Sequence, residues 1–192
     1  MTVRPGTIAI TATVVLFCAL SSFIYVNVNR EHNEDRLFQA ASFGDTATIK
    51  ALIAGGQNVN ICPDRLDRST PLMGAAANKH ADTVVALLDA GADVNMRDKK
   101  GNSALLSAAK FGDQQTAIIL LEHGANPNVT DDKGRSPLFF AALHGYTALA
   151  RTLLEKGADI NRADARADTP LKIAIKHNHK ELAELLRTAG KR

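Results

Sequence analysis

The sequence predicts an all-α chain in which short helical hairpins stack into a solenoid. Similar ten-residue segments recur at a spacing of 33 residues, beginning at Ser103, Ser136 and Thr169. Apolar residues form 45% of the 192-residue chain, but aromatic residues form only 5%. Alanine and leucine predominate among the apolar residues, a composition typical of thin, closely packed helices. Regular repetition of such helices favours a stacked array over a single mixed core.

The first element is an apolar segment within residues 1–29. Residues 5–29 carry no charged side chain, and about 20 apolar residues span a bilayer. We expect a hydrophobic helix that serves either as a transmembrane anchor through residues 7–28 or as a cleaved signal peptide. Arg4 precedes this segment, so the positive-inside rule predicts that the chain beyond it leaves the cytoplasm.

In a bacterium this topology predicts a single-pass protein of the inner membrane with its folded part in the periplasm. If the segment is a cleaved signal, the protein is instead soluble in the periplasm. Residues 30–35 are polar and are predicted to form a linker to the repeats.

The repeats themselves occupy residues 36–192. A Thr or Ser that opens the first helix of a copy, such as Ser136 before Pro137, supplies a hydroxyl cap and a preset φ. Alanine pairs let the first helices approach closely, and leucine pairs place an apolar face on the second helices. One such hairpin cannot bury this face alone, so neighbouring copies must stack. The predicted copies are residues 36–68, 69–101, 102–134, 135–167 and 168–192.

These motifs resemble the ankyrin repeat. The resemblance rests on openings such as Thr70-Pro71-Leu72, on the alanine and leucine pairs, and on closings such as Gly91-Ala92-Asp93-Val94-Asn95, and it extends over residues 36–192. It implies an ankyrin-repeat solenoid in which the loops and the first helices line a concave binding face. The histidine that often follows Thr-Pro-Leu in the family is absent, so we expect a weaker loop network or apolar packing in its place. Its positions are occupied by Met73, Leu106, Phe139 and Lys172.

The polar residues do not form a catalytic or metal-binding pattern. Cys18 and Cys62 have no spacing typical of a disulfide framework or a zinc site, although a redox role for Cys62 stays open. His177 and His179 do not share a helical face, and no third metal ligand is apparent. We therefore predict a protein that is not an enzyme and that needs no cofactor, metal or small-molecule substrate. A net charge of +3 is too small to indicate nucleic-acid binding.

The candidate binding residues are the positions that differ between copies, because the recurring residues serve the framework. The loops between hairpins carry an excess of cations, which predicts a protein partner with an acidic patch. Phe111 and Leu143 are the predicted apolar anchors, while a merely solvated row of loops is the alternative. The predicted contacts are Arg65, Arg68, Lys99, Lys100, Asn102, Lys110, Phe111, Lys133, Arg135, Leu143, His144, Arg166 and Lys176.

The chain is also similar to small exported bacterial ankyrin-repeat proteins. That similarity implies a non-catalytic module that binds or stabilises a partner on the periplasmic side of the inner membrane, for example an oxidative-stress enzyme such as a catalase. The alternative is an immunity protein that neutralises a toxin in the periplasm.

Overall fold

The computed structural model describes residues 34–190. Its contacts divide the chain into two units, Met1–Arg36 and Leu37–Arg192, and the second contains the helical hairpins. The predicted hydrophobic helix within residues 1–29 lies outside the described residues, as does most of the predicted linker. Among the described helices, none has both the length and the apolar character needed to cross a membrane.

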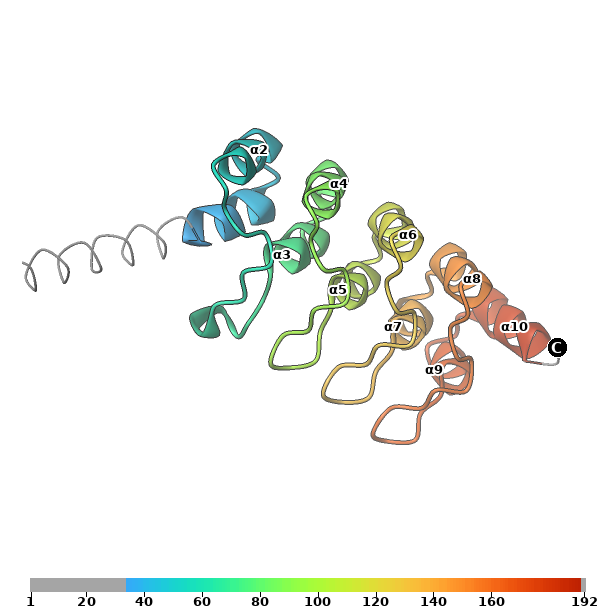
Figure 1. The fold of residues 1–192 in the computed structure, drawn as a ribbon. Helices are drawn as coiled ribbons and strands as arrows, with labels where there is room; N and C mark the ends of the chain where they lie inside the picture. Colours follow the sequence, from blue (N-terminus) through green and yellow to red (C-terminus); the bar gives the residue numbers. More distant parts are fainter. Residues whose placement is uncertain (1–33, 191–192) are drawn as a thin grey trace, which may run out of the picture. The chain divides into compact units, whose positions relative to one another are not determined.

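The second unit is a stack of helical hairpins, which confirms the all-α solenoid. Figure 1 shows the second helices of the hairpins along one side of the stack and the first helices along the other, with loops extending beyond the first helices. After a helical stretch at residues 34–43, the second helices are α2 (Thr46–Ala54), α4 (Ala81–Asp89), α6 (Gln114–Glu122), α8 (Thr147–Glu155) and α10 (Lys180–Ala189). The first helices are α3 (Pro71–Ala77), α5 (Ala104–Phe111), α7 (Pro137–His144) and α9 (Pro170–Lys176).

The first helices begin where the sequence places a hydroxyl residue. The Ser136 hydroxyl accepts a hydrogen bond from the N–H of Phe139 at 3.1 Å, and Thr70, Ser103 and Thr169 cap their helices in the same way. Each cap satisfies one N–H that the helix itself leaves without a partner. The capping residue recurs in the four copies after the first and fixes where their hairpins start.

Close packing of the first helices depends on the alanine pairs. Ala75, Ala76, Ala108 and Ala109 are fully buried, because the neighbouring first helix packs directly over them. The position after Thr-Pro-Leu, where the family often has histidine, is apolar and buried in three copies. These residues are Met73, Leu106 and Phe139, whereas Lys172 in the last copy is exposed. Apolar packing thus replaces the histidine in these copies. This was one of the two alternatives that the sequence offered, the other being a weaker loop network.

An asparagine in the closing motif ties each of the first three repeats to the next one. The side-chain amide of Asn95 donates to the carbonyl of Gly124 at 3.1 Å, and its oxygen accepts from the N–H of Asn126 at 2.9 Å. Asn60 and Asn128 make the same pair of bonds to the copies that follow them. The recurrence of Asn in the sequence is therefore explained by a contact between copies, because one side chain satisfies two backbone groups of its neighbour.

A ring packed over a glycine forms a second contact between copies. Gly112 ends α5 with a φ of +68°, and a Cβ added there would lie 2.4 Å from the Tyr146 ring of the next copy. His80 and His179 cover Gly44 and Gly145 in the same way. Each of these histidines also contacts a neighbouring carbonyl through Nε2, at 3.1 and 3.2 Å. Histidine thus links adjacent copies, but from a position different from the one the family favours.

Candidate protein-interaction face

The loops that precede the first helices form a row of fingers, and each inner finger is built around one aspartate. The Asp98 carboxylate accepts the N–H groups of Lys100 and Asn102, both at 2.8 Å. Asp131 and Asp164 do the same in their own fingers. These carboxylates therefore hold the turns by hydrogen bonding, which explains why the aspartates recur with the repeat period.

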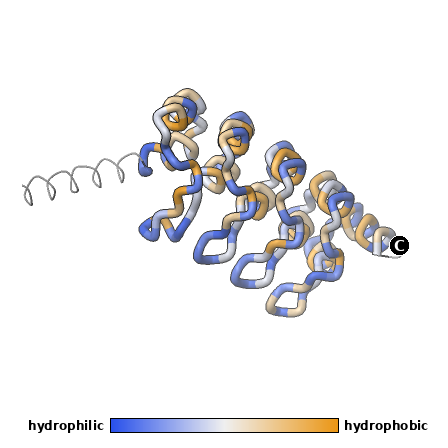
Figure 2. Tube along the Cα trace, viewed as in Figure 1, coloured by the Kyte–Doolittle hydropathy of each residue, from blue (hydrophilic) through white to orange (hydrophobic). Residues whose placement is uncertain are grey.

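Backbone hydrogen bonds join neighbouring fingers. The N–H of Lys99 donates to the carbonyl of Asp67 at 2.8 Å, and the N–H of Asp132 donates to the carbonyl of Lys100 at 2.8 Å. The N–H of Ala165 continues the series to the next finger at 2.9 Å. The fingers and the first helices α3, α5, α7 and α9 form one surface, which we call the finger face (Figure 1). In Figure 2 the fingers are mostly hydrophilic, whereas hydrophobic residues gather in the helices.

In the first fingers the cations are largely compensated by the chain's own carboxylates. The Lys99 ammonium lies 3.5 Å from the Asp64 carboxylate and donates to the Asp64 carbonyl at 3.1 Å. The Lys100 ammonium lies 3.4 Å from the Asp67 carboxylate. Asp64 belongs to a short 3₁₀ helix, η1 (Asp64–Leu66), within the longer loop after Asn60. The extra length of this loop therefore supplies acidic partners to the second finger.

Arg135 is held within its own finger. Its guanidinium binds the Asp131 carboxylate at 2.6 and 2.8 Å and lies 4.8 Å from the centre of the buried Phe140 ring. Burial of the Asp131 carboxyl opposes ionisation, but the hydrogen bonds and charge of Arg135, with the N–H of Lys133, hold the pKa of Asp131 below its ordinary value. Arg135 thus braces the third finger and offers little free charge to a partner.

Three cations near the last fingers have no ion-pair partner within the described part of the chain. Lys133, Arg166 and Lys176 are exposed, and their side chains make no ion pair or hydrogen bond with any residue between 34 and 190. All three line a hollow of about 450 Å³ on the finger face, together with the apolar side chains of Phe139, Leu143 and Ile173 and with Asp164 and Asp168. Uncompensated positive charge therefore gathers around an apolar floor.

A second hollow of about 740 Å³ lies nearer the first repeats on the same face. Phe38, Met73 and Phe111 give it an apolar lining, and Lys110 stands beside them. Phe111 is 49% exposed, a large fraction for an aromatic side chain. It ends its helix one residue before Gly112, and Phe43 stands at the same place in the first copy with 80% of its surface exposed.

The comparisons with known proteins agree with this architecture. The family model described as "Ankyrin repeats (3 copies)" matches residues 37–131 and 123–192. The chain belongs to the ankyrin-repeat family. It is similar to Inversin of Gallus gallus, with 42% identity over 74 residues, or 38% of this chain. It is also similar to the E3 ubiquitin-protein ligase XBAT32 of Arabidopsis thaliana, with 33% identity over 78 residues, or 41% of this chain.

The similarity covers 7% of the length of Inversin and 15% of that of XBAT32. The chain therefore spans a small part of these relatives. Ankyrin repeats are in general non-catalytic protein-interaction modules, and this coarser function is what the comparisons establish for the chain.

The ankyrin-repeat structure groups the thirteen predicted contact residues into three sets. One hollow collects Lys133, Arg135, Leu143, Arg166 and Lys176. The other collects Asn102, Lys110, Phe111 and His144. The remaining residues lie on the first two fingers outside both hollows and are Arg65, Arg68, Lys99 and Lys100.

Sequence reasoning missed several apolar residues: Phe38 and Ile173 line the hollows, and Phe43 is exposed but lines neither of them. Phe43 could have been found, because Phe43-Gly44 stands in register with Phe111-Gly112. Phe38 and Ile173 carry no such signal, since helix periodicity alone does not show which apolar residues of a helix also line a hollow.

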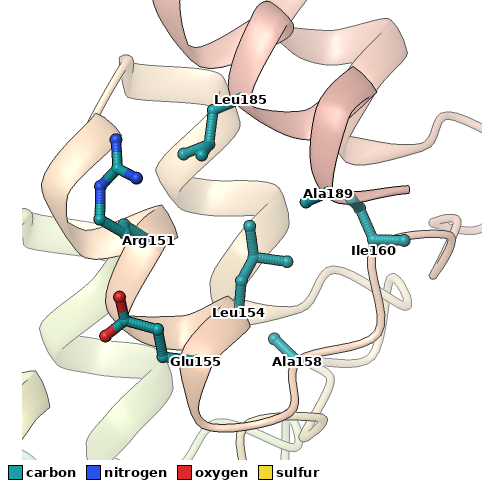
Figure 3. A pocket seen from close by; sticks show the side chains of 7 residues that line it. All are labelled: Arg151, Leu154, Glu155, Ala158, Ile160, Leu185 and Ala189. Carbon is teal, nitrogen blue, oxygen red and sulfur yellow. The ribbon is translucent and has the colours of Figure 1, made fainter. Parts of the chain in front are cut away.

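A third hollow, of about 370 Å³, lies away from the fingers between α8 and α10 (Figure 3). Leu154 and Leu185 line it, with Arg151 and Glu155 beside them. No predicted contact residue lines it. Among residues 34–190, no three His, Cys, Asp or Glu side chains are grouped as a metal ion would require.

Proposed function

We propose that the finger face binds a protein partner that presents an acidic patch. The observation that supports this most is the placement of nine of the thirteen variable residues in two adjoining hollows of one face. Half-exposed aromatic side chains such as Phe111 supply the apolar contact that dominates interface energies. The finger cations supply long-range attraction and orientation.

We also propose that this module works on the periplasmic side of the inner membrane, held by residues 7–28 or released after their removal. The support is the uncharged stretch at residues 5–29 and the position of Arg4. The partner is an enzyme that the module stabilises, for example an oxidative-stress enzyme such as a catalase. A toxin neutralised by an immunity protein would occupy the same face, and the identity of the captured partner separates the two.

Affinity capture from detergent-extracted cells with the full-length protein tests the binding face. We expect Phe111→Ser to reduce capture of the specific partner by about tenfold or more, because half-exposed aromatic anchors contribute more than about 1 kcal/mol to binding. Arg151→Glu, on α8 and outside both hollows of the finger face, serves as the control and should leave capture unchanged. If neither substitution changes capture, the finger face is not where the partner binds.

The location is tested separately. The mass of the mature N-terminus distinguishes anchor from cleaved signal. Protease added to cells with a permeable outer membrane should digest the repeats while the inner membrane is intact. Protection of the repeats under that condition would contradict the proposed location.

A further inference from the structure

We propose that the two ends of the finger face bind different chemical groups. The end near the first repeats is apolar, and the other end binds carboxylates through Lys133, Arg166 and Lys176. The matching partner is a protein segment with an apolar side chain toward one end and a cluster of Asp or Glu toward the other. This inference rests on the proposed function, since it names the chemistry of the partner that the finger face binds.

The first argument is charge compensation. Lys99 and Lys100 in the second finger already have carboxylate partners in the chain, at 3.5 and 3.4 Å. Lys133, Arg166 and Lys176 have none among the described residues. A partner carboxylate that replaced an existing pair at the second finger would gain little. At the last fingers it would meet cations that hold no ion pair, so no existing pair has to be broken, and the nearby Asp164 and Asp168 offset only part of the attraction.

The second argument is the floor beneath these cations. Leu143 is half-buried and Phe139 and Ile173 are buried where they line the hollow. Apolar walls and partial exclusion of water strengthen a charge interaction relative to one in bulk solvent. A carboxylate seated here is therefore held better than one on an open finger tip.

The third argument concerns the kind of anion. The hollow also contains Asp164 and Asp168, and the exposed Asp132 stands on the neighbouring finger. A nucleic-acid strand carries a phosphate at every nucleotide and would pass close to these carboxylates. Discrete Asp or Glu side chains of a protein segment can be spaced so that they meet the cations and avoid the carboxylates of the hollow. The arrangement thus favours an acidic protein segment over a phosphate backbone.

The spacing of the two ends follows from the repeat geometry. Phe111 belongs to the third copy and Lys176 to the fifth, so two helix layers separate them. Packed helices lie about 8–10 Å apart, and an extended chain advances about 3.3 Å per residue. An extended partner segment would therefore place its acidic cluster about five or six residues from its apolar anchor.

The experiment uses full-length protein in detergent and fluorescent peptides of defined composition. Each peptide carries Phe-Leu at one end and three Glu at the other, separated by four to eight Gly-Ser residues, in both chain directions, and each has a matched peptide with Gln for Glu. We expect at least one Glu peptide to bind about tenfold or more tightly than its Gln match at 50 mM NaCl. The difference should shrink at 300 mM NaCl because salt screens exposed charges.

Two variants locate the effect. The triple substitution Lys133→Ala, Arg166→Ala and Lys176→Ala should remove the preference for Glu over Gln. The matched double substitution Lys99→Ala and Lys100→Ala should keep it within about twofold, since those cations are already paired. All five side chains are exposed, and circular dichroism checks that both variants keep the helix content.

Equal binding of Glu and Gln peptides would overturn the inference, as would loss of the preference only in the double variant. Tighter binding of an oligothymidylate than of any Glu peptide would assign the hollow to nucleic acid and overturn it as well. Capture of the partner distinguishes this failure from that of the proposed function. If Phe111→Ser loses the partner but the triple variant still captures it, the finger face remains the binding surface and only the assignment of a carboxylate-binding end is wrong.

Discussion

Replacement of Gly112 by alanine should destabilise the repeats through two separable effects. The residue has a φ of +68°, in the left-handed region, where a Cβ costs about 1–2 kcal/mol. In addition, that Cβ would lie 2.4 to 2.8 Å from three atoms of the Tyr146 ring. The ring packs between two copies, so it must shift, and overpacking of this kind costs about 1–3 kcal/mol.

Gly124 separates the two effects. It has a φ of +83°, but an added Cβ would meet no atom within 4 Å. Gly124→Ala should therefore cost only the backbone term, about 1–2 kcal/mol. Gly112→Ala should cost about 2–5 kcal/mol, the sum of the backbone and overpacking ranges.

Urea unfolding of the full-length protein in detergent, followed by circular dichroism at 222 nm, measures both free energies. Tyr146→Ser should bring the cost of Gly112→Ala down to that of Gly124→Ala, because it removes the ring that the new methyl meets. The natural sequence offers a parallel case. Lys79 stands at the position equivalent to Gly112 with a φ of +63°, and Asp113 replaces the ring in the following copy. Equal costs for the two glycine substitutions would refute the ring contact.

Three further predictions concern contacts within and between copies. Asn95→Ala should cost about 1–3 kcal/mol in urea unfolding because it removes two bonds to the next copy, whereas Asn161→Ala, whose exposed side chain makes no such bond within residues 34–190, should be nearly neutral. Ser136→Ala should cost about 1 kcal/mol through loss of its helix cap. The lowered pKa of Asp131 means that its contribution is present above about pH 4 and is lost as pH falls through the folded-state pKa; Asp131→Asn should make the unfolding free energy less pH-dependent in that acid range.

The fold was predictable because repetition makes each local signal count several times. A single Ser-Pro step or alanine pair is a weak indication, but five copies in register leave one consistent architecture. The hydroxyl caps and the finger aspartates could be predicted for the same reason. The contact between Tyr146 and Gly112 could not, because sequence does not show which ring of the next copy reaches a given turn.

The candidate face was predictable only as a set of variable positions. Sequence reasoning treated Lys99, Lys100 and Lys133 as equivalent cations, since each belongs to a finger. The structure separates them, because the longer first loop brings Asp64 and Asp67 to the first two and leaves Lys133 without such a partner. Ion pairs between copies depend on how neighbouring loops dock, and that information is tertiary.

Hydrogen exchange of the full-length protein, with and without its captured partner, tests most directly whether the finger face is the binding surface. We predict slower exchange of backbone amides in residues 129–135 and 162–168 and in α5, α7 and α9, with no change in α8 and α10. Slower exchange confined to α8 and α10, with the fingers unchanged, would contradict the account.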